Sequence, residues 1–192
     1  MTDDLDMRQG LSEELLYLLR RHPREGWGEN ADLGDLARFW LTRHDGFRQL
    51  GGALTDALTR FREGEVEAMQ FGGFFAPRLQ HFLTELHHHH MIEDQHYFPV
   101  FAAAETRLAR GFDILESDHE LIHERIGRVI ASANGLLGLL EGGDGDRIRR
   151  AADTYAADSD LLVNGLLRHL DDEEDLIVPL MIERGERDLG VS

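Results

Sequence analysis

Histidines and carboxylates are paired at one-turn spacing in two places in this sequence. His89 is followed four residues later by Glu93, and His169 is followed four residues later by Glu173. Residues four apart on an α-helix lie on the same face, so each pair would present an imidazole beside a carboxylate. Both side chains are metal ligands in proteins. The spacing therefore predicts a metal site with ligands from at least two helices.

The two pairs belong to an internal repeat, which also indicates a single histidine as a ligand. A shift of 79 residues along the chain places His44 on His123. His123 lies four residues after His119, so both of these imidazoles would project from one helix face. His44 is therefore predicted as the ligand of a further helix. A shift of 80 residues superposes the other members of the repeat, which are His89 on His169, Glu93 on Glu173 and Pro99 on Pro179.

These donors predict a pair of cations with one open coordination position. Two octahedral ions bridged by both carboxylates and one oxygen would lie about 3.5–4 Å apart and would leave one position for an exogenous ligand. Trp40 stands where the second half of the repeat has His119, so one ion would have three histidines and the other two. The two-histidine ion would bind the ligand, with Trp40 lining an apolar pocket. The predicted metal ligands are His44, His89, Glu93, His119, His123, His169 and Glu173.

A run of four histidines, His87–His90, leaves a choice of ligand in its segment. At most one or two of the four can face inward from a helix. His89 is preferred, because it alone keeps the ten-residue distance to a proline that separates His169 from Pro179. The rival pair at the same four-residue spacing is His90 with Asp94.

Other carboxylates near these motifs admit a competing interpretation. Glu-x-x-His sequences begin at Glu85, Glu116 and Glu120, and this form is typical of ferritin-like carboxylate sites. The last predicted helix lacks such a sequence, and the first offers no good candidate for the lone glutamate that this class needs. Of the other acidic residues beside the motifs, Glu174 and Asp94 are expected either to support the ligands from behind or to be solvated. Asp171 and Asp172 are expected on a solvated face.

Helices must position these residues, and the hydrophobic spacing is helical along nearly the whole chain. Short connections between long helices favour antiparallel neighbours, so the sequence predicts an all-α, antiparallel up-down-up-down four-helix bundle with a short additional N-terminal helix. The helices are expected at about residues 32–63, 74–97, 105–141 and 145–176, after a short one near 11–21. The predicted domains are an N-terminal extension (1–31) with no assigned function, the bundle (32–184) and a C-terminal tail (185–192).

Composition restricts the partners and the metal chemistry. The 192 residues include 37 acidic and 20 basic ones, and the formal charge of −17 disfavours nucleic-acid and membrane partners. Cysteine is absent, which excludes disulfides, thiolate zinc sites and iron–sulfur clusters. The N-terminus is acidic where a secretory signal is basic, and no apolar stretch approaches the roughly twenty residues that span a bilayer. We therefore expect a cytoplasmic protein.

The order of the motifs resembles the hemerythrin-like (HHE cation-binding) family over about residues 36–182. The resemblance implies two iron ions with a bridging oxo or hydroxo group inside a four-helix bundle. It also implies that O2, or a related small molecule such as NO or peroxide, binds at the less-coordinated iron. The motifs that carry it are His44, His89-x3-Glu93, His119-x3-His123 and His169-x3-Glu173, with Tyr-Phe-Pro and Ile-Val-Pro after the carboxylates.

Three functions follow, and the sequence favours the first. It is a ligand-binding protein that takes up O2 or NO in sensing, storage or stress response, because no nucleophile, glycine-rich phosphate loop or organic-cofactor motif accompanies the ligands. The alternative is a di-iron enzyme that reduces peroxide or NO, or that supports iron-centre repair. The third is a structural or regulatory module with zinc or manganese, since imidazole and carboxylate suit several ions.

Overall fold

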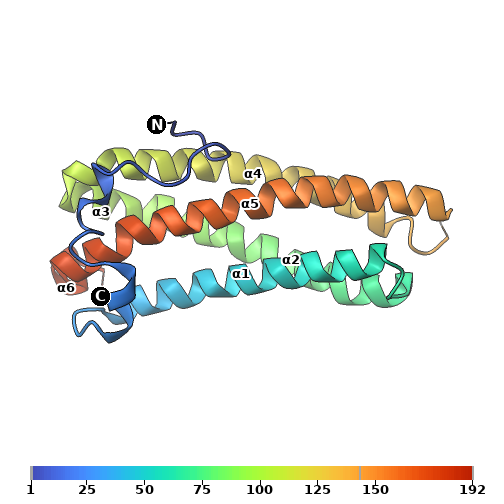
Figure 1. Cartoon of the computed structure of the whole chain (residues 1–192), viewed down its shortest axis with the longest axis horizontal. Coiled ribbons are helices and arrows are strands. Elements are labelled where there is room, and N and C mark those ends of the chain that lie inside the picture. The colour runs from blue at the N-terminus through green and yellow to red at the C-terminus, as the bar shows by residue number, and fades with distance from the viewer. Residues whose placement is uncertain (1, 143, 192) are drawn as a thin grey trace. The chain divides into compact units, whose positions relative to one another are not determined.

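The fold is given by a computed structural model, which describes residues 2–142 and 144–191. These residues form helices and turns and contain no strand, so the predicted all-α class is confirmed. Of the described helices, none is long and apolar enough to cross a membrane. Most of the chain belongs to four long helices, which are α1 (Asp35–Arg62), α2 (Ala68–Ile92), α4 (Ala109–Leu137) and α5 (Gly145–Arg184) (Figure 1).

The residues group into two compact units. Unit 1 comprises Met1–Asp45, His89–Glu120 and Gly165–Ser192, and unit 2 comprises Gly46–His88 and Leu121–Asn164. Each of the four long helices contributes a segment to both units. Unit 1 contains the first turns of α1 and α4 and the last turns of α2 and α5, so consecutive helices run in opposite directions there. This is the antiparallel arrangement that the short connections predict.

Unit 1 has a hydrophobic core that includes the C-terminal part of α5. The sequence places the end of this helix near residue 176, but the helix continues through Pro179 to Arg184. Proline inside a helix costs about 3 kcal/mol, and burial of several large apolar side chains outweighs this cost. The buried side chains of this stretch are Leu176, Ile177, Val178, Leu180 and Met181.

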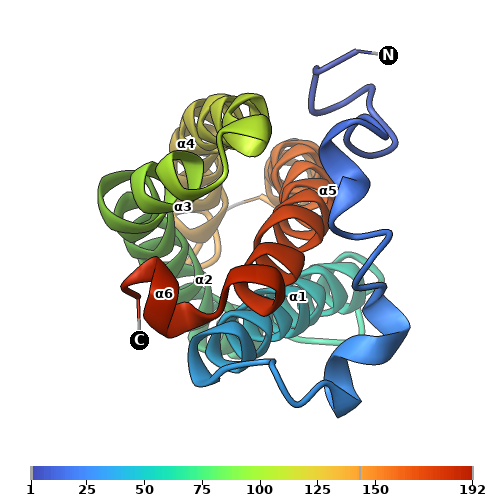
Figure 2. The same cartoon turned by 90° about the vertical axis from the view of Figure 1, so that its left-hand side faces the viewer.

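The N-terminal segment packs into the same core without forming a continuous helix. In place of the short helix expected near 11–21, the structure has only the 3₁₀ turn η1 (Leu15–Tyr17), and a second 3₁₀ helix, η2 (Arg24–Glu29), follows it. A short isolated helix is marginal in water, and this segment is held by its apolar side chains instead. Figure 2 shows it running beside the C-terminal part of α5 and then to the start of α1. Its buried core residues are Leu11, Leu15, Leu18 and Trp27.

Helix α2 differs from its predicted bounds at both ends. It begins at Ala68 and not at the expected residue 74, so Gly72 and Gly73 lie within it. A Cβ at Gly72 would lie 3.1 Å from Cδ1 of Leu140, a tight contact that would require the Leu140 side chain to shift. At its other end α2 continues into a π-helical turn, Glu93–Tyr97, and then into α3, Phe98–Ala104. Two further short helices, η4 (Thr106–Leu108) and α6 (Glu186–Leu189), complete unit 1.

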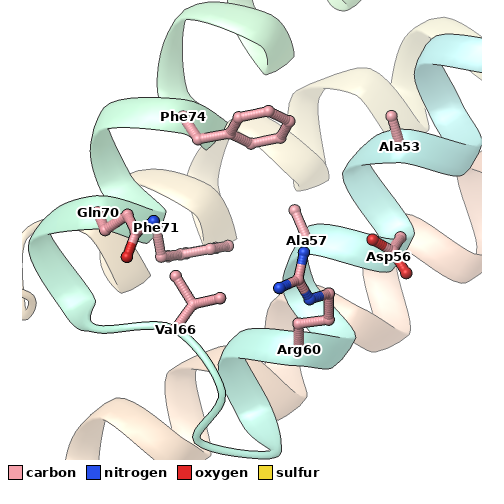
Figure 3. A pocket seen from close by; sticks show the side chains of 8 residues that line it. All are labelled: Ala53, Asp56, Ala57, Arg60, Val66, Gln70, Phe71 and Phe74. Atoms are coloured by element: carbon pink, nitrogen blue, oxygen red, sulfur yellow. The ribbon is translucent and has the colours of Figure 1, made fainter.

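Unit 2 has buried apolar side chains of its own, among them a cluster of aromatic rings. Phe71 stacks on Phe61 at 4.3 Å and on Phe75 at 4.7 Å between ring centroids, and Tyr155 packs edge-on against Phe75. A pocket of about 200 Å³ lies beside this cluster (Figure 3). Its lining offers a single carboxylate, Asp56, and no histidine, so it lacks the donors of a metal site.

Candidate metal centre

Two groups of side chains in unit 1 bring metal-type ligand atoms within 4.8 Å of one another. They come from α1, from α2 with its π-helical turn, from α4 and from α5. Nearly all of these side chains are buried, and only His89 is partly exposed. The carboxylate-containing group is His44, His89, Glu93 and Glu173, and the trihistidine group is His90, His119 and His169.

Glu93 faces both groups, with a different oxygen toward each. Its Oε1 lies 2.8 Å from Nε2 of His89, which belongs to the carboxylate-containing group. Its Oε2 lies 3.6 Å from Nε2 of His119, which belongs to the trihistidine group. A carboxylate held in this way can bind one cation through each oxygen.

Glu173 repeats this arrangement from the opposite helix. Its Oε1 lies 3.5 Å from Nε2 of His44, and its Oε2 lies 3.2 Å from Nε2 of His169. Each of its oxygens therefore also faces a different group. Because both carboxylates have this orientation, the seven side chains lie together as one site that could hold a cation in each group.

The histidine nitrogens converge at a separation that suits a bound cation. Nε2 of His44 lies 3.0 Å from Nε2 of His89, and Nε2 of His119 lies 3.0 Å from Nε2 of His169. Two nitrogens bound at right angles to an ion through bonds of about 2.1 Å would lie about 3.0 Å apart. His90 completes the trihistidine group, with its ring stacked on His119 at 3.9 Å between centroids.

Three of these histidines contact a carboxylate through the other ring nitrogen. Metal-bound histidines typically donate this second N–H to a carboxylate, which fixes the tautomer and leaves Nε2 for the ion. The three contacts are His44 Nδ1 to Glu174 Oε1 at 2.9 Å, His119 Nδ1 to Asp94 Oδ1 at 2.7 Å, and His169 Nδ1 to Asp118 Oδ2 at 3.2 Å.

The two inner carboxylates have opposite pKa shifts. Burial, together with the charge of Glu173, raises the pKa of Glu93 well above its ordinary value. Burial also opposes ionisation of Glu173, but His44 and His169 outweigh it and lower the pKa of that carboxyl. Although Oε1 of Glu93 lies 2.8 Å from Nε2 of His89, the geometry is not that of a hydrogen bond, and neither oxygen of Glu93 accepts one from the residues that the structure describes. A cation would satisfy this buried acid, so the donor set fits a metal.

The pKa values of three histidines are shifted by burial and by the charged groups around them. Burial lowers the pKa of His89 well below its ordinary value, and burial lowers that of His119 despite its hydrogen bond with Asp94. Burial disfavours the charged form of His169 too, but its contacts with Asp118 and Glu173 raise its pKa to about 9. Neutral imidazoles at His89 and His119 are ready to bind a cation through nitrogen.

Trp40 borders the carboxylate-containing group, as the sequence predicts for a residue beside the two-histidine position. Its indole Nε1 donates a hydrogen bond to Oε1 of Glu173. Its ring packs edge-on against Tyr97 at 5.0 Å and His89 at 6.0 Å between centroids. Trp40 therefore both holds Glu173 and supplies an apolar wall.

The structure brings six of the seven predicted ligands together and places the seventh elsewhere. His123 belongs to unit 2 and to neither group, and its Nε2 lies 3.3 Å from Nδ1 of His87. His90, which the sequence offers as the alternative to His89, is buried and takes the position in the trihistidine group that was predicted for His123. The candidate set is therefore corrected by replacing His123 with His90. The count of three histidines beside one position and two beside the other is unchanged.

Of the residues behind the ligands, the sequence indicates Asp94 and Glu174, which contact His119 and His44, but it does not indicate Asp118, Asp172 or Arg8. Asp118 is buried beside His169, and Asp172, which was expected on a solvated face, is also buried. A signal for Asp118 exists, because it lies three residues after Leu115 and four before Ile122, on the apolar face of α4. Arg8 binds both carboxylates from the N-terminal segment, where no periodic pattern indicates it.

Comparison with known proteins agrees with this geometry. The model of the hemerythrin HHE cation binding domain matches residues 35–181, which is more than half of the chain. No curated protein and no solved structure matches the chain. The matched range contains both groups of ligands and leaves out the N-terminal segment. The chain therefore belongs to the hemerythrin HHE cation-binding domain family.

Proposed function

We propose that this protein holds two iron ions with a bridging oxo or hydroxo group and binds O2, or a related small molecule such as NO or peroxide. Its role would lie in sensing, storage or stress response. The observation that carries the proposal is that Glu93 and Glu173 each direct one oxygen to the carboxylate-containing group and the other oxygen to the trihistidine group. Two carboxylates with this orientation suit two cations about 3.5–4 Å apart.

The unequal histidine count supports an open position beside the carboxylate-containing group. That group offers two imidazoles, while the trihistidine group offers three. The aromatic rings of Trp40, Tyr97 and Phe101 pack together on the two-histidine side. Such a wall excludes water and suits a small uncharged ligand.

The setting proposed for this activity is the cytoplasm, with the small ligand as the partner. The formal charge of −17 repels nucleic acid and anionic lipid surfaces. Iron is proposed over zinc or manganese because of the family, since nitrogen and oxygen donors alone suit all three.

Elemental analysis tests the metal assignment on protein purified without a histidine-chelating step. We expect two iron per chain in the wild type and in His88→Ala, a variant of an exposed neighbour in the histidine run. His44→Ala removes a buried imidazole of the carboxylate-containing group and should lower the iron content. Zinc or manganese in place of iron, or a single ion, would contradict the proposal.

Ligand binding is tested on the iron-loaded protein after anaerobic reduction. Exposure to O2 or NO should produce a visible absorption change that reverses when the gas is removed. His44→Ala should lose this change, while His88→Ala should keep it. Steady-state consumption of peroxide or NO that is lost in His44→Ala would instead assign the enzyme function.

A further inference from the structure

The N-terminal segment lies outside the matched domain, yet two of its arginines reach the carboxylates behind the histidines. The match begins at residue 35, whereas Arg8 and Arg24 precede it. We propose that this segment is part of the metal centre, with Arg8 and Arg24 as positioning residues that orient one histidine in each group. The inference rests on the proposed metal centre.

Arg8 serves the trihistidine group through Asp118. Its guanidinium binds Asp118 with two nitrogens, of which Nη1 lies 2.8 Å from Oδ1, and its Nε lies 2.7 Å from Oδ2 of Asp172. The Arg8 side chain is only 1% exposed. Asp118 in turn contacts Nδ1 of His169. A guanidinium held by two hydrogen bonds fixes the plane of the carboxylate, and hence the direction in which His169 is held.

Arg24 serves the carboxylate-containing group in the same way, through Glu174. Its Nη1 lies 2.8 Å from Oε2 of Glu174, while Oε1 of that carboxylate lies 2.9 Å from Nδ1 of His44. Two further hydrogen bonds anchor the guanidinium to α5, from Nε to Asp175 at 2.6 Å and from Nη2 to the carbonyl of Asp171 at 2.6 Å. Each group therefore has one histidine backed by a carboxylate and an arginine.

Each arginine also ties its carboxylate to a second carboxylate on α5, which limits how far the first carboxylate can turn. Arg8 links Asp118 to Asp172, and Arg24 links Glu174 to Asp175. A metal-bound histidine donates its outer N–H to such an acceptor, and this hydrogen bond keeps Nε2 directed at the ion. Without Arg8 and Arg24, Asp118 and Glu174 would lose this restraint, and the histidines that they contact would be oriented less strictly.

A purely anchoring role would not distinguish these arginines from others on the same segment. Arg21 also joins the segment to α5, with Nη1 at 2.8 Å from Glu183, but the Arg21 side chain is 59% exposed, and Glu183 contacts none of the ligand histidines named above. Arg21→Gln is therefore the matched control. It removes a charge and an ion pair from the same segment without touching the carboxylates behind the ligands.

The test uses the full chain in metal-free form, titrated with Co²⁺ as a probe, with affinity and the visible cobalt absorption as readouts. Arg8→Gln and Arg24→Gln should each weaken binding of one of the two Co²⁺ ions by roughly 10–100-fold and shift its absorption band, because the partners behind metal ligands have effects of this size. Arg21→Gln should leave both readouts unchanged. Arg8→Lys keeps the charge and should recover part of the affinity.

A double variant separates positioning from loosening of the fold. If Arg8 acts through Asp118, Arg8→Gln combined with Asp118→Asn should bind Co²⁺ no more weakly than Asp118→Asn alone. Equal affinity in Arg8→Gln, Arg24→Gln and Arg21→Gln would overturn the inference. If Arg8→Gln does not fold by circular dichroism, Arg8→Lys and Arg24→Gln decide the matter. Failure of the wild type to bind two Co²⁺ would contradict the metal centre itself.

Discussion

Adjacent histidines on one helix belong to different groups because Glu93 lies between them around the helix axis. Successive residues of an α-helix are turned by about 100°, so Glu93 lies about 40° from His89 on one side and about 60° from His90 on the other. Both imidazoles can therefore face inward beside the same carboxylate. The four-residue spacing and the distance to proline favour His89, but neither excludes His90 as a second ligand.

The exchange of His90 for His123 leads to a direct comparison of two variants. His90→Ala removes a fully buried imidazole from the trihistidine group, so we expect iron to fall from two per chain toward one. The loss of affinity should be at least about tenfold, since even partners outside the ligand set cost that much. His123→Ala should retain both ions. Elemental analysis of the two proteins measures this, and the reverse result would restore the set predicted from the sequence.

The sequence predicts those parts of the candidate site in which two residues lie on the same helix. Pairs such as His89 with Glu93 are visible because four-residue spacing alone places them on one face. The contact of Arg8 with Asp118 joins residues 110 positions apart, and no local pattern encodes it. Asp172 was expected in solvent for the same reason, because the segment that covers it has no periodic signal.

The sequence predicts the four long helices and their alternating directions, but it predicts the ends of these helices less well and does not predict the short helices α3 and α6. The sequence predicts that the second helix begins at about residue 74, but α2 begins at Ala68, and Gly72 lies within it close to Leu140. Gly64, in contrast, does follow the end of α1 and has a φ of +77°, a conformation that favours glycine. Sequence shows the residue type at both positions, whereas only tertiary contacts show which role it has.

The π-helical turn Glu93–Tyr97 is a second feature that periodicity does not reveal. The backbone N–H of Phe98 donates a hydrogen bond to the carbonyl of Glu93, five residues earlier, whereas an α-helix joins residues four apart. Such turns are rare and occur frequently at functional sites. Here the turn begins at a carboxylate that faces both groups of histidines and ends at Tyr97, which packs on Trp40.

Helix α5 supplies a prediction about alkaline stability that is independent of the metal. Tyr155 lies in unit 2, 1% exposed, and burial raises its pKa to about 12 against an opposing hydrogen bond with Ser159. The unfolded chain loses this proton near pH 10, before the folded one does. The free energy of unfolding is therefore undiminished by this group below pH 10 and should fall by roughly 2–3 kcal/mol as pH rises to about 12.

Urea unfolding of the metal-free protein at several pH values between 9 and 12 measures this slope. Tyr155→Phe keeps the ring that packs on Phe75 but has no proton to lose, so its slope should be shallower than that of the wild type. Its metal content should be unchanged, since unit 2 contains none of the grouped ligands. Identical slopes in the two proteins would contradict the shift.

Buried negative charge is concentrated in unit 1, so a bound metal should affect the stability of the protein. Among the described residues, the buried carboxylates all belong to unit 1, and they are Glu93, Asp118, Asp172, Glu173 and Glu174. Arg8 is buried with them, and Arg24 and Arg168 reach them from partly exposed positions. Two divalent cations would offset the negative charge that these arginines leave.

Metal removal should therefore destabilise the protein, and most strongly in unit 1. At a free metal concentration about 100 times the Kd, binding stabilises the folded state by about 2.7 kcal/mol for each ion, and a chelator should lower the Tm accordingly. Amide hydrogen exchange should then accelerate in His89–Glu120 and Gly165–Ser192 more than in Leu121–Asn164. In His90→Ala the difference between chelated and loaded protein should shrink, because one ion is already weakly held. If hydrogen exchange accelerates equally in both units, or if the chelator leaves the Tm unchanged, the buried carboxylates are neutralised by protons and arginines alone.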